Sequence, residues 1–443
     1  MKKGKKLWGA LALILFLTVS ISVPCKAADF RFPSDEDGQL VVVLDPGHGG
    51  ENLGADYNGY IEKEINMIVA NAMYEELTKY EGITVYMTRT GDVPEDISLK
   101  NRAKFAKEVN ADYLFCLHFN MSAENTFWGS EVWIQSKGQE NRDGYAFASI
   151  QMETMADMGL YIRGVKTRLN DKGTDYYGIL RHCKEFGIAA ALIEHCHVDN
   201  DKDTPFCDSV EDLEAFGRAD ATSVAKYFGL SSKELGVDYS DYKIPVEIKE
   251  SEEYMHHDIT DPEVSLIYLE ECDYENRKVT LSMTASDVDT PMLYYSYSVD
   301  GGDTFVDYFP WPDTDIMGQK SPENIRFTID IEPGTTPVIV ARAYNQYDRY
   351  TTSNVLNGFE AFPELVTEPE IQENLKNDID EDTLKGDSQI KNENLSTEAG
   401  SYADENQEPV NSLVLILVVC LFAVIGLFLV LLLVRALRRN KGQ

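Results

Sequence analysis

Four side chains that can bind a metal ion or move a proton lie where apolar segments begin or end. His48 follows the run VVVLDPG, His118 lies near the end of DYLFCLHFN, Glu194 closes IAAALIE, and Glu62 begins the helical pattern EKEINMIVANAM. Two histidines and one carboxylate are a known ligand set for catalytic zinc, which keeps its fourth position for water. A second carboxylate that does not bind the metal can take the proton of that water.

Each of these residues also has an ordinary structural explanation. A histidine at the end of a strand is more often a hydrogen-bonded core residue than a ligand. Glu62 could be a solvated carboxylate that the helix dipole favours in a first turn. Glu194 is harder to explain in this way, because a wholly apolar strand carries it inward and buried carboxylates are rarely left without a partner.

Residues 39–230 alternate between strand and helix patterns. The predicted strands are QLVVVLD, ITVYMTR, ADYLFCLHFN, GSEVWIQS and IAAALIEHC. The predicted helices are EINMIVANAMYEELTKY, SLKNRAKFAKEVN, GYAFASIQMETMADMGL and VEDLEAFGRADATSVAKYFG, and Ser98 can cap the second of them. This alternation predicts a three-layer α/β/α domain with a mostly parallel twisted sheet, in which functional groups collect where the strands end.

The rest of the chain divides into segments of different composition. Short β-rich runs separated by turn signals predict a small all-β sandwich of immunoglobulin or fibronectin type over residues 237–360. Residues 361–410 are predicted to be a disordered acidic linker, since the stretch 360–409 holds 15 acidic residues and 3 lysines. The charge-free apolar segment 413–434 would span ~33 Å as a helix, which is enough to cross a membrane once.

The two ends of the chain predict its topology. The N-terminus has four lysines, an apolar run and small residues near Ala27, which is the pattern of a secretory signal peptide over residues 1–27. An uncleaved anchor is the alternative. The basic tail 435–443 is predicted to stay in the cytoplasm, because positive residues flank membrane helices on that side. We therefore expect a single-pass protein of the cell membrane whose catalytic domain is extracellular.

Charge and cysteine content narrow the function further. The net charge of −35 argues against nucleic acid as a partner, because phosphate binding needs a basic surface. Of the seven cysteines, Cys25 lies in the signal peptide and Cys420 in the membrane segment. The five that remain predict at least one unpaired thiol, and their spacing does not fit a structural zinc ribbon.

Five sequence blocks in order resemble the zinc-dependent N-acetylmuramoyl-L-alanine amidases of the amidase-3 type. These blocks are VVVLDPGHGG, GADYNGYIEKEIN, ITVYMTRT, SLKNRAKFAKEVNADYLFCLHFN and GIAAALIEHCHVDN, and the resemblance runs over residues 40–229. It implies that His48, Glu62 and His118 bind zinc and that Glu194 is the catalytic glutamate. It also implies hydrolysis of the amide that joins N-acetylmuramic acid to L-alanine in peptidoglycan.

The chain departs from the family pattern in two places. Phe119 and Met121 flank Asn120 where the family usually has small residues, and HCHVDN follows Glu194 where it usually has an apolar turn with glycine. His195 and His197 are therefore alternative ligands or reactive groups. We expect instead that they lie on the opposite face of the strand or in the loop beyond it.

Asp45 and Asn120 are plausible outer residues that orient the metal ligands, although they could equally shape their loops. The β-sandwich is read as a spacer, with contact to the wall or to a protein partner as the alternative. Two rival functions remain open at this point: a zinc peptidase that acts within the stem peptide, and a non-catalytic surface protein that binds peptidoglycan.

Overall fold

The computed structural model describes residues 39–364 except 58, 124 and 250–252. The predicted signal peptide, the membrane segment 413–434, the basic tail and all but the first four residues of the acidic linker lie outside the described residues. Within the described residues, no helix is long and apolar enough to cross a membrane.

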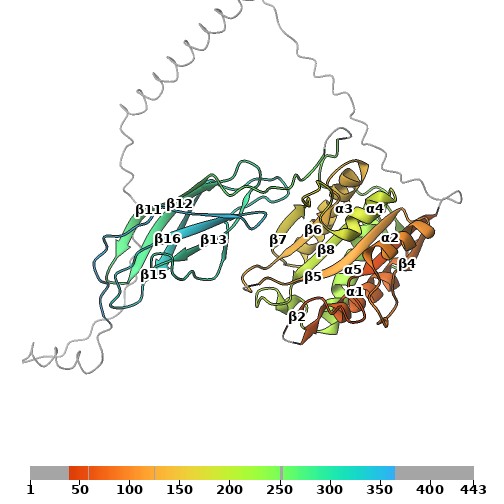
Figure 1. Cartoon of the computed structure of the whole chain (residues 1–443), viewed down its shortest axis with the longest axis horizontal. Helices are drawn as coiled ribbons and strands as arrows, with labels where there is room; N and C mark the ends of the chain where they lie inside the picture. Colours follow the sequence, from red (N-terminus) through yellow and green to blue (C-terminus); the bar gives the residue numbers. More distant parts are fainter. Residues whose placement is uncertain (1–38, 58, 124, 250–252, 365–443) are drawn as a thin grey trace, which may run out of the picture. The chain divides into compact units, whose positions relative to one another are not determined.

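A six-stranded sheet forms the centre of the N-terminal part (Figure 1). In spatial order its strands are β4 (Ile83–Met87), β1 (Leu40–Pro46), β5 (Tyr113–Asn120), β8 (Ala189–His197), β6 (Ser130–Ile134) and β7 (Ile162–Lys166). Every pair of neighbours is parallel except β6 and β8, which are antiparallel. The prediction of a mostly parallel sheet is therefore confirmed.

Helices cover both faces of this sheet. The larger apolar cluster joins one face to helices α1 (Glu62–Leu77), α3 (Gln139–Asp157) and α5 (Val210–Phe228). A second cluster joins the other face to α2 (Leu99–Glu108) and α4 (Gly178–Glu185). Consecutive residues of one strand, such as Leu114 and Phe115, belong to different clusters, because successive side chains of a strand point to opposite faces of the sheet. The result is an α/β/α arrangement of three layers.

Short elements complete this part of the chain. They are the hairpin of β2 (Asp56–Tyr57) and β3 (Tyr60–Ile61), the 3-10 helix η1 (Thr204–Phe206), and the pair β9 (Ser231–Ser232) and β10 (Val237–Asp238). The predicted cap of α2 is present, since Ser98 Oγ accepts a hydrogen bond from the backbone N–H of Asn101. Strand β7 and helix α4 were not predicted from the sequence.

Two small sheets follow, from Val264 onward. One has the order β11 (Val264–Asp273), β12 (Lys278–Ser286) and β15 (Asn324–Asp330). The other has the order β14 (Phe309–Pro310), β13 (Met292–Ser298), β16 (Val340–Asn345) and β17 (Tyr350–Thr352). Apolar side chains of both sheets share one core. Residues 237–255, in contrast, contribute tyrosines and aliphatic side chains that pack on the α/β core, so the β part proper starts later than residue 237.

The turn after β16 contacts the edge strand β7 of the large sheet. Gln346 Nε2 donates to the backbone carbonyls of Arg163 (3.3 Å) and Val165 (3.0 Å), and Gln346 is fully buried. The hydroxyl of Tyr347 accepts a hydrogen bond from the backbone N–H of Thr167 at 3.0 Å. The β part is thus hydrogen-bonded to the α/β part, which a simple spacer would not require.

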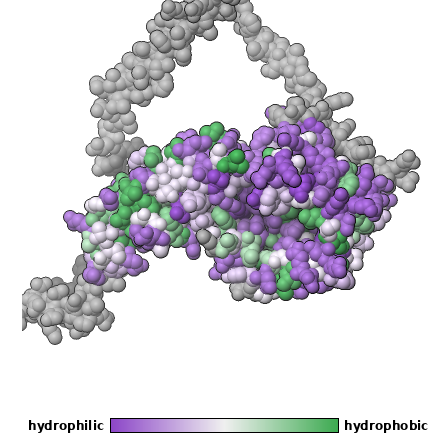
Figure 2. Space-filling model, viewed as in Figure 1, coloured by the Kyte–Doolittle hydropathy of each residue, from purple (hydrophilic) through white to green (hydrophobic). Residues whose placement is uncertain are grey.

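Hydrophilic residues cover most of the visible face of the α/β part (Figure 2). This agrees with the large excess of acidic over basic residues in the chain.

Candidate active site

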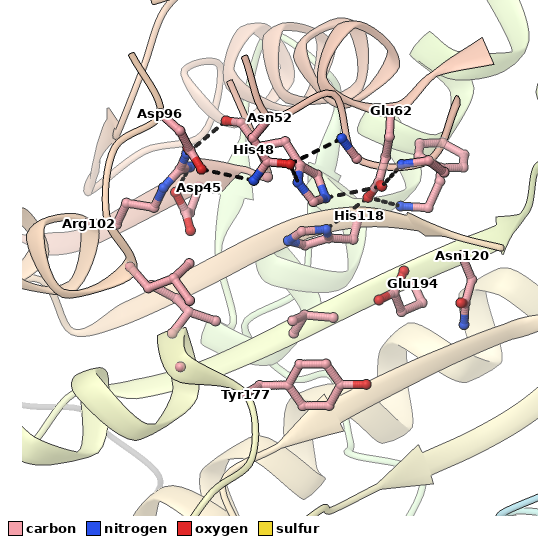
Figure 3. Close-up of a pocket in the computed structure, with 18 of the residues that line it drawn as sticks. Asp45, His48, Asn52, Glu62, Asp96, Arg102, His118, Asn120, Tyr177 and Glu194 are labelled. Atoms are coloured by element: carbon pink, nitrogen blue, oxygen red, sulfur yellow. Dashed lines mark hydrogen bonds and ion pairs between the residues drawn. The ribbon is translucent and has the colours of Figure 1, made fainter. Parts of the chain in front are cut away.

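Glu62 lies at the centre of the site that the sequence predicted (Figure 3). It is the first residue of α1, and its carboxylate accepts hydrogen bonds from the backbone N–H groups of Ala55 (2.8 Å) and Phe119 (3.1 Å). Its Oε2 atom lies 3.1 Å from His48 Nε2, and its Oε1 atom lies 2.8 Å from His118 Nδ1. The two imidazoles therefore meet on one buried carboxylate.

These three residues form a cluster with the dimensions of a metal site. One ligand atom from each of His48, Glu62 and His118 lies within 4.8 Å of the other two. The two rings are nearly perpendicular, at 82°, with their centroids 4.9 Å apart. Imidazole nitrogens and a carboxylate oxygen are suitable donors for zinc. Among the described residues this is the one cluster of its kind.

Two glycines make the close approach of these side chains sterically feasible. A Cβ atom on Gly47 would lie 2.3 Å from His118 Cε1, in collision with the ring. A Cβ atom on Gly54 would lie 2.4 Å from Glu62 Oε2, and its φ of +72° also favours glycine. The glycines around His48 therefore leave room for the second histidine and the glutamate.

The contacts within this cluster shift the pKa values of Glu62 and His48 in opposite directions. Burial alone would raise the pKa of Glu62, but hydrogen bonds with His118 and His48 outweigh it and hold the pKa well below the usual range. Burial lowers the pKa of His48, yet its hydrogen bond and charge interaction with Glu62 raise the net value above 6.5. Glu62 is thus an anion that attracts cations to this position.

Glu194 lies across the cavity from the Glu62 carboxylate, on β8 (Figure 3). Both residues line a cavity of ≈ 620 Å³, together with His48 and His118. Glu194 is only 9% exposed, and its buried Oε2 atom has no hydrogen-bond partner among the described residues. Burial, together with the charges of Glu62 and Glu131, raises the pKa of Glu194 well above its usual range. A carboxylate in this environment is a stronger proton acceptor than an exposed glutamate.

The two predicted outer residues hydrogen-bond to groups other than the two imidazole rings. Asp45 is fully buried and accepts hydrogen bonds from Thr88 Oγ1 (2.6 Å) and Arg102 Nη1 (2.8 Å). Asn120 Nδ2 donates to Glu131 Oε1 at 3.1 Å, while its Oδ1 accepts from the backbone of Met121. Asp45 reaches the site through Arg102, and Asn120 fixes the end of β5.

His195 and His197 have structural partners on β8. His195 is fully buried, with Nε2 2.8 Å from Asp220 Oδ2 and Nδ1 2.8 Å from the carbonyl of His118. His197 Nδ1 lies 3.2 Å from the carbonyl of Gly129. Neither belongs to the metal-sized cluster found among the described residues. The five cysteines of the described region are all free thiols.

Several residues around His48 were missed by the sequence analysis. Arg102 donates to the carbonyls of Pro46 (2.8 Å) and His48 (2.7 Å), and Arg89 donates to those of Pro46 (3.0 Å) and Gly47 (2.8 Å). Both guanidinium groups therefore hold the backbone of the segment that carries His48. Arg89 lies in MTRT, just after a strand, and Arg102 lies in LKNR, at the start of a helix. No local sequence pattern links either arginine to His48.

A buried ionic cluster lies next to Asn120. Glu131 Oε2 accepts hydrogen bonds from Arg163 Nε (2.7 Å) and Lys166 Nζ (2.6 Å), and all three side chains are at most 3% exposed. Arg163 also bonds to Asp348 Oδ2, in the turn after β16, at 2.6 Å. Burial alone would raise the pKa of Glu131, but the charges of Lys166 and Arg163 outweigh it and keep Glu131 ionised.

An α/β domain with two histidines and two glutamates around one cavity at its strand ends is the arrangement of a hydrolase. The family model described as N-acetylmuramoyl-L-alanine amidase matches residues 42–226. The chain is 31% identical over 163 residues to the uncharacterized protein YqiI of Bacillus subtilis, which covers 37% of this chain and 73% of that protein. It is 27% identical over 195 residues to the N-acetylmuramoyl-L-alanine amidase CwlM of Bacillus licheniformis, covering 43% and 69% of the two chains.

Among solved structures, the catalytic domain of the amidase CwlV from Bacillus (Paenibacillus) polymyxa var. colistinus is 25% identical. The match covers 43% of this chain and 98% of that one, with a TM-score of 0.37. The chain belongs to the N-acetylmuramoyl-L-alanine amidase family, and its α/β domain is a peptidoglycan amidase.

Proposed function

We propose that the chain is a zinc-dependent N-acetylmuramoyl-L-alanine amidase that is tethered to the outer face of the cytoplasmic membrane and remodels the cell wall. The observation that carries the zinc proposal is the convergence of His48, His118 and Glu62 within 4.8 Å. Two neutral imidazoles and one carboxylate leave a coordination position for water, as a catalytic site requires.

The donor set fits the metal. Glu62 stays ionised, and both histidines offer a ring nitrogen to the same carboxylate at 3.1 and 2.8 Å. Zinc bound there would polarise the scissile carbonyl and lower the pKa of a bound water. Glu194, which faces the same cavity, accepts the proton of the attacking water and then gives it to the leaving amine of L-alanine. The cavity offers space for a substrate beside these residues, and the raised pKa of Glu194 makes it a stronger proton acceptor than an exposed glutamate.

Mass spectrometry of purified muropeptides treated with the full-length chain tests the reaction. We expect free stem peptides with an N-terminal L-alanine, together with intact glycan. Cleavage inside the stem peptide would identify a zinc peptidase instead. Binding to walls without any product would identify a non-catalytic binder, and a chelator-treated sample serves as the control for metal dependence.

The membrane proposal rests on sequence features outside the described residues. The apolar segment 413–434 and the basic residues after it favour one C-terminal membrane helix, with peptidoglycan reached through the acidic stretch before it. Fifty flexible residues have a root-mean-square reach of ~40 Å. Deleting most of 365–408 should reduce wall release in cells while leaving the activity of the solubilised protein unchanged. Equal wall release by both proteins would contradict the tether, and protease added to intact cells tests the outer-face location.

A further inference from the structure

We infer that Asn52 is a positioning residue of the metal site, and that a chain of hydrogen bonds from Arg102 through Asp96 to Asn52 fixes the tautomer of His48. This inference rests on the proposed zinc function and adds to it. Three hydrogen bonds make up this chain. Arg102 Nη2 lies 2.8 Å from Asp96 Oδ1, Asp96 Oδ2 lies 2.9 Å from Asn52 Nδ2, and Asn52 Oδ1 lies 3.0 Å from His48 Nδ1. His48 Nε2 then faces Glu62 (Figure 3).

The partners of Asn52 determine which way its amide points. The Asp96 carboxylate, ionised beside Arg102, only accepts hydrogen bonds, so Asn52 presents its NH2 group there. The backbone N–H of Gly54 donates to Asn52 Oδ1 at 3.3 Å, which fixes the same orientation independently. The oxygen of Asn52 therefore faces the ring of His48. Because this oxygen is an acceptor, His48 Nδ1 must carry the hydrogen.

The other ring nitrogen of His48, Nε2, then carries no hydrogen and has a free lone pair. Nε2 lies 3.1 Å from Glu62 Oε2, and neither atom brings a hydrogen when the ring is neutral. Two lone pairs at this distance need a shared cation, which can be a proton or a metal ion. Hydrogen bonding of a ligand's second ring nitrogen is the usual way to fix its tautomer and orientation for a metal.

Arg102 connects this series of hydrogen bonds to the backbone of His48. It is 1% exposed, and the guanidinium nitrogen that bonds Asp96 also donates to the carbonyl of His48. His48 has a φ of +63°, a conformation that a non-glycine residue adopts only when its surroundings hold it. Arg102 thus holds the main chain of His48 directly and its ring through Asp96 and Asn52.

Zinc affinity of the full-length protein tests this chain of bonds. Asn52→Leu keeps the number of side-chain heavy atoms but removes all three hydrogen bonds of the Asn52 side chain. We expect the zinc Kd, measured by competition with a chromophoric chelator, to rise ~10–100-fold. We also expect the visible absorption spectrum of the cobalt-substituted protein to change, because the coordination of His48 changes. Wild-type affinity together with an unaltered cobalt spectrum would overturn the inference.

Three further variants separate positioning from folding. Asp92→Asn is the matched control, since Asp92 bonds Lys63 and the N–H of Gly50 in the same region without contacting His48 or Asn52. It should keep wild-type affinity. The exchange Asn52→Asp with Asp96→Asn reverses the hydrogen bond between positions 52 and 96, but it keeps an acceptor for Arg102 and an acceptor for His48 Nδ1. Asn52→Asp alone places two carboxylates together. We expect the exchange to bind zinc more tightly than Asn52→Asp.

The exchange variant decides the matter if Asn52→Leu does not fold. An exchange variant that binds zinc no better than Asn52→Asp would overturn the inference. Failure of the proposed function would instead be seen in the wild-type chain, as a lack of zinc binding or of muropeptide hydrolysis. The two failures are thus measured in different proteins.

Discussion

Glu131 and Glu194 are paired directly across the antiparallel strands β6 and β8, yet their pKa values are shifted in opposite directions. Glu131 contacts Arg163 and Lys166, and its pKa is lowered because these charges outweigh the effect of burial. Within the part of the chain that the structure describes, Glu194 contacts no such cation, and burial raises its pKa. A pair of carboxylates with separated pKa values is typical of sites where only one of them transfers protons. The geometry therefore favours Glu194, and not Glu131, as the proton acceptor.

Substitution of Glu194 by Gln should remove the proton acceptor and leave the metal ligands in place. We expect kcat on muropeptides to fall ~10²–10⁴-fold, which is typical for loss of a general base. Zinc content, measured by atomic absorption, should stay at the wild-type level. Activity close to wild type would contradict the assignment, and so would an empty metal site in this variant.

Substitution of Glu62 by Gln should have a different result, because Glu62 contacts both histidines. A neutral amide is a weaker ligand than a carboxylate and gives up the charge that attracts the metal. We expect zinc to be lost or held loosely, and activity to be lost with it. If Glu62→Gln retained zinc while Glu194→Gln lost it, the two roles would have to be exchanged.

The raised pKa of Glu194 predicts a dependence of stability on pH in the metal-free protein. A carboxyl group whose folded pKa lies above its unfolded value near 4.3 contributes stability below that value and loses it as pH rises through the folded pKa. Glu194→Gln carries no such charge. We therefore expect the free energy of unfolding in urea, relative to that of the wild type, to be higher for the variant at pH 8 than at pH 5. The same difference at both pH values would contradict this prediction.

The buried ionic cluster predicts a large cost for removing one cation. Arg163→Met removes one of the two cations that contact Glu131 and also removes the contact to Asp348. Breaking a buried pair in this way typically costs ~3–5 kcal/mol in the free energy of unfolding. Arg326→Met is the matched control, because its pair with Glu270 is exposed and should contribute at most ~1 kcal/mol. Similar losses in the two variants would argue against a special role of the cluster.

The layers of the α/β part were predictable because apolar periodicity is a local signal. Strand β7 and helix α4 were missed for a physical reason. The strand sequence IRGVK holds two cations, and their burial makes sense only beside Glu131, more than 30 residues earlier in the chain. The antiparallel direction of β6 was also beyond a local pattern, since it depends on which distant strand it pairs with.

The four principal site residues were predictable because they stand at the ends of periodic segments. Asn52 and Asp96 were not, because each lies in an irregular loop and their contact joins positions 44 residues apart. The roles of Asp45 and Asn120 were equally hidden, since their partners Arg102 and Glu131 are brought to them only by the folded sheet.

The contact of Gln346 with β7 has a consequence for how this protein can be divided. Strand β7 is the last strand of the large sheet, and its outward carbonyls at Arg163 and Val165 receive their hydrogen bonds from Gln346. A chain cut before residue 264 would leave these acceptors open to other molecules. Exposed strand edges promote pairing between chains, so the shortened enzyme should self-associate even where its catalytic residues are intact. The β part thus covers the β7 edge and hinders its pairing with a strand of another protein molecule.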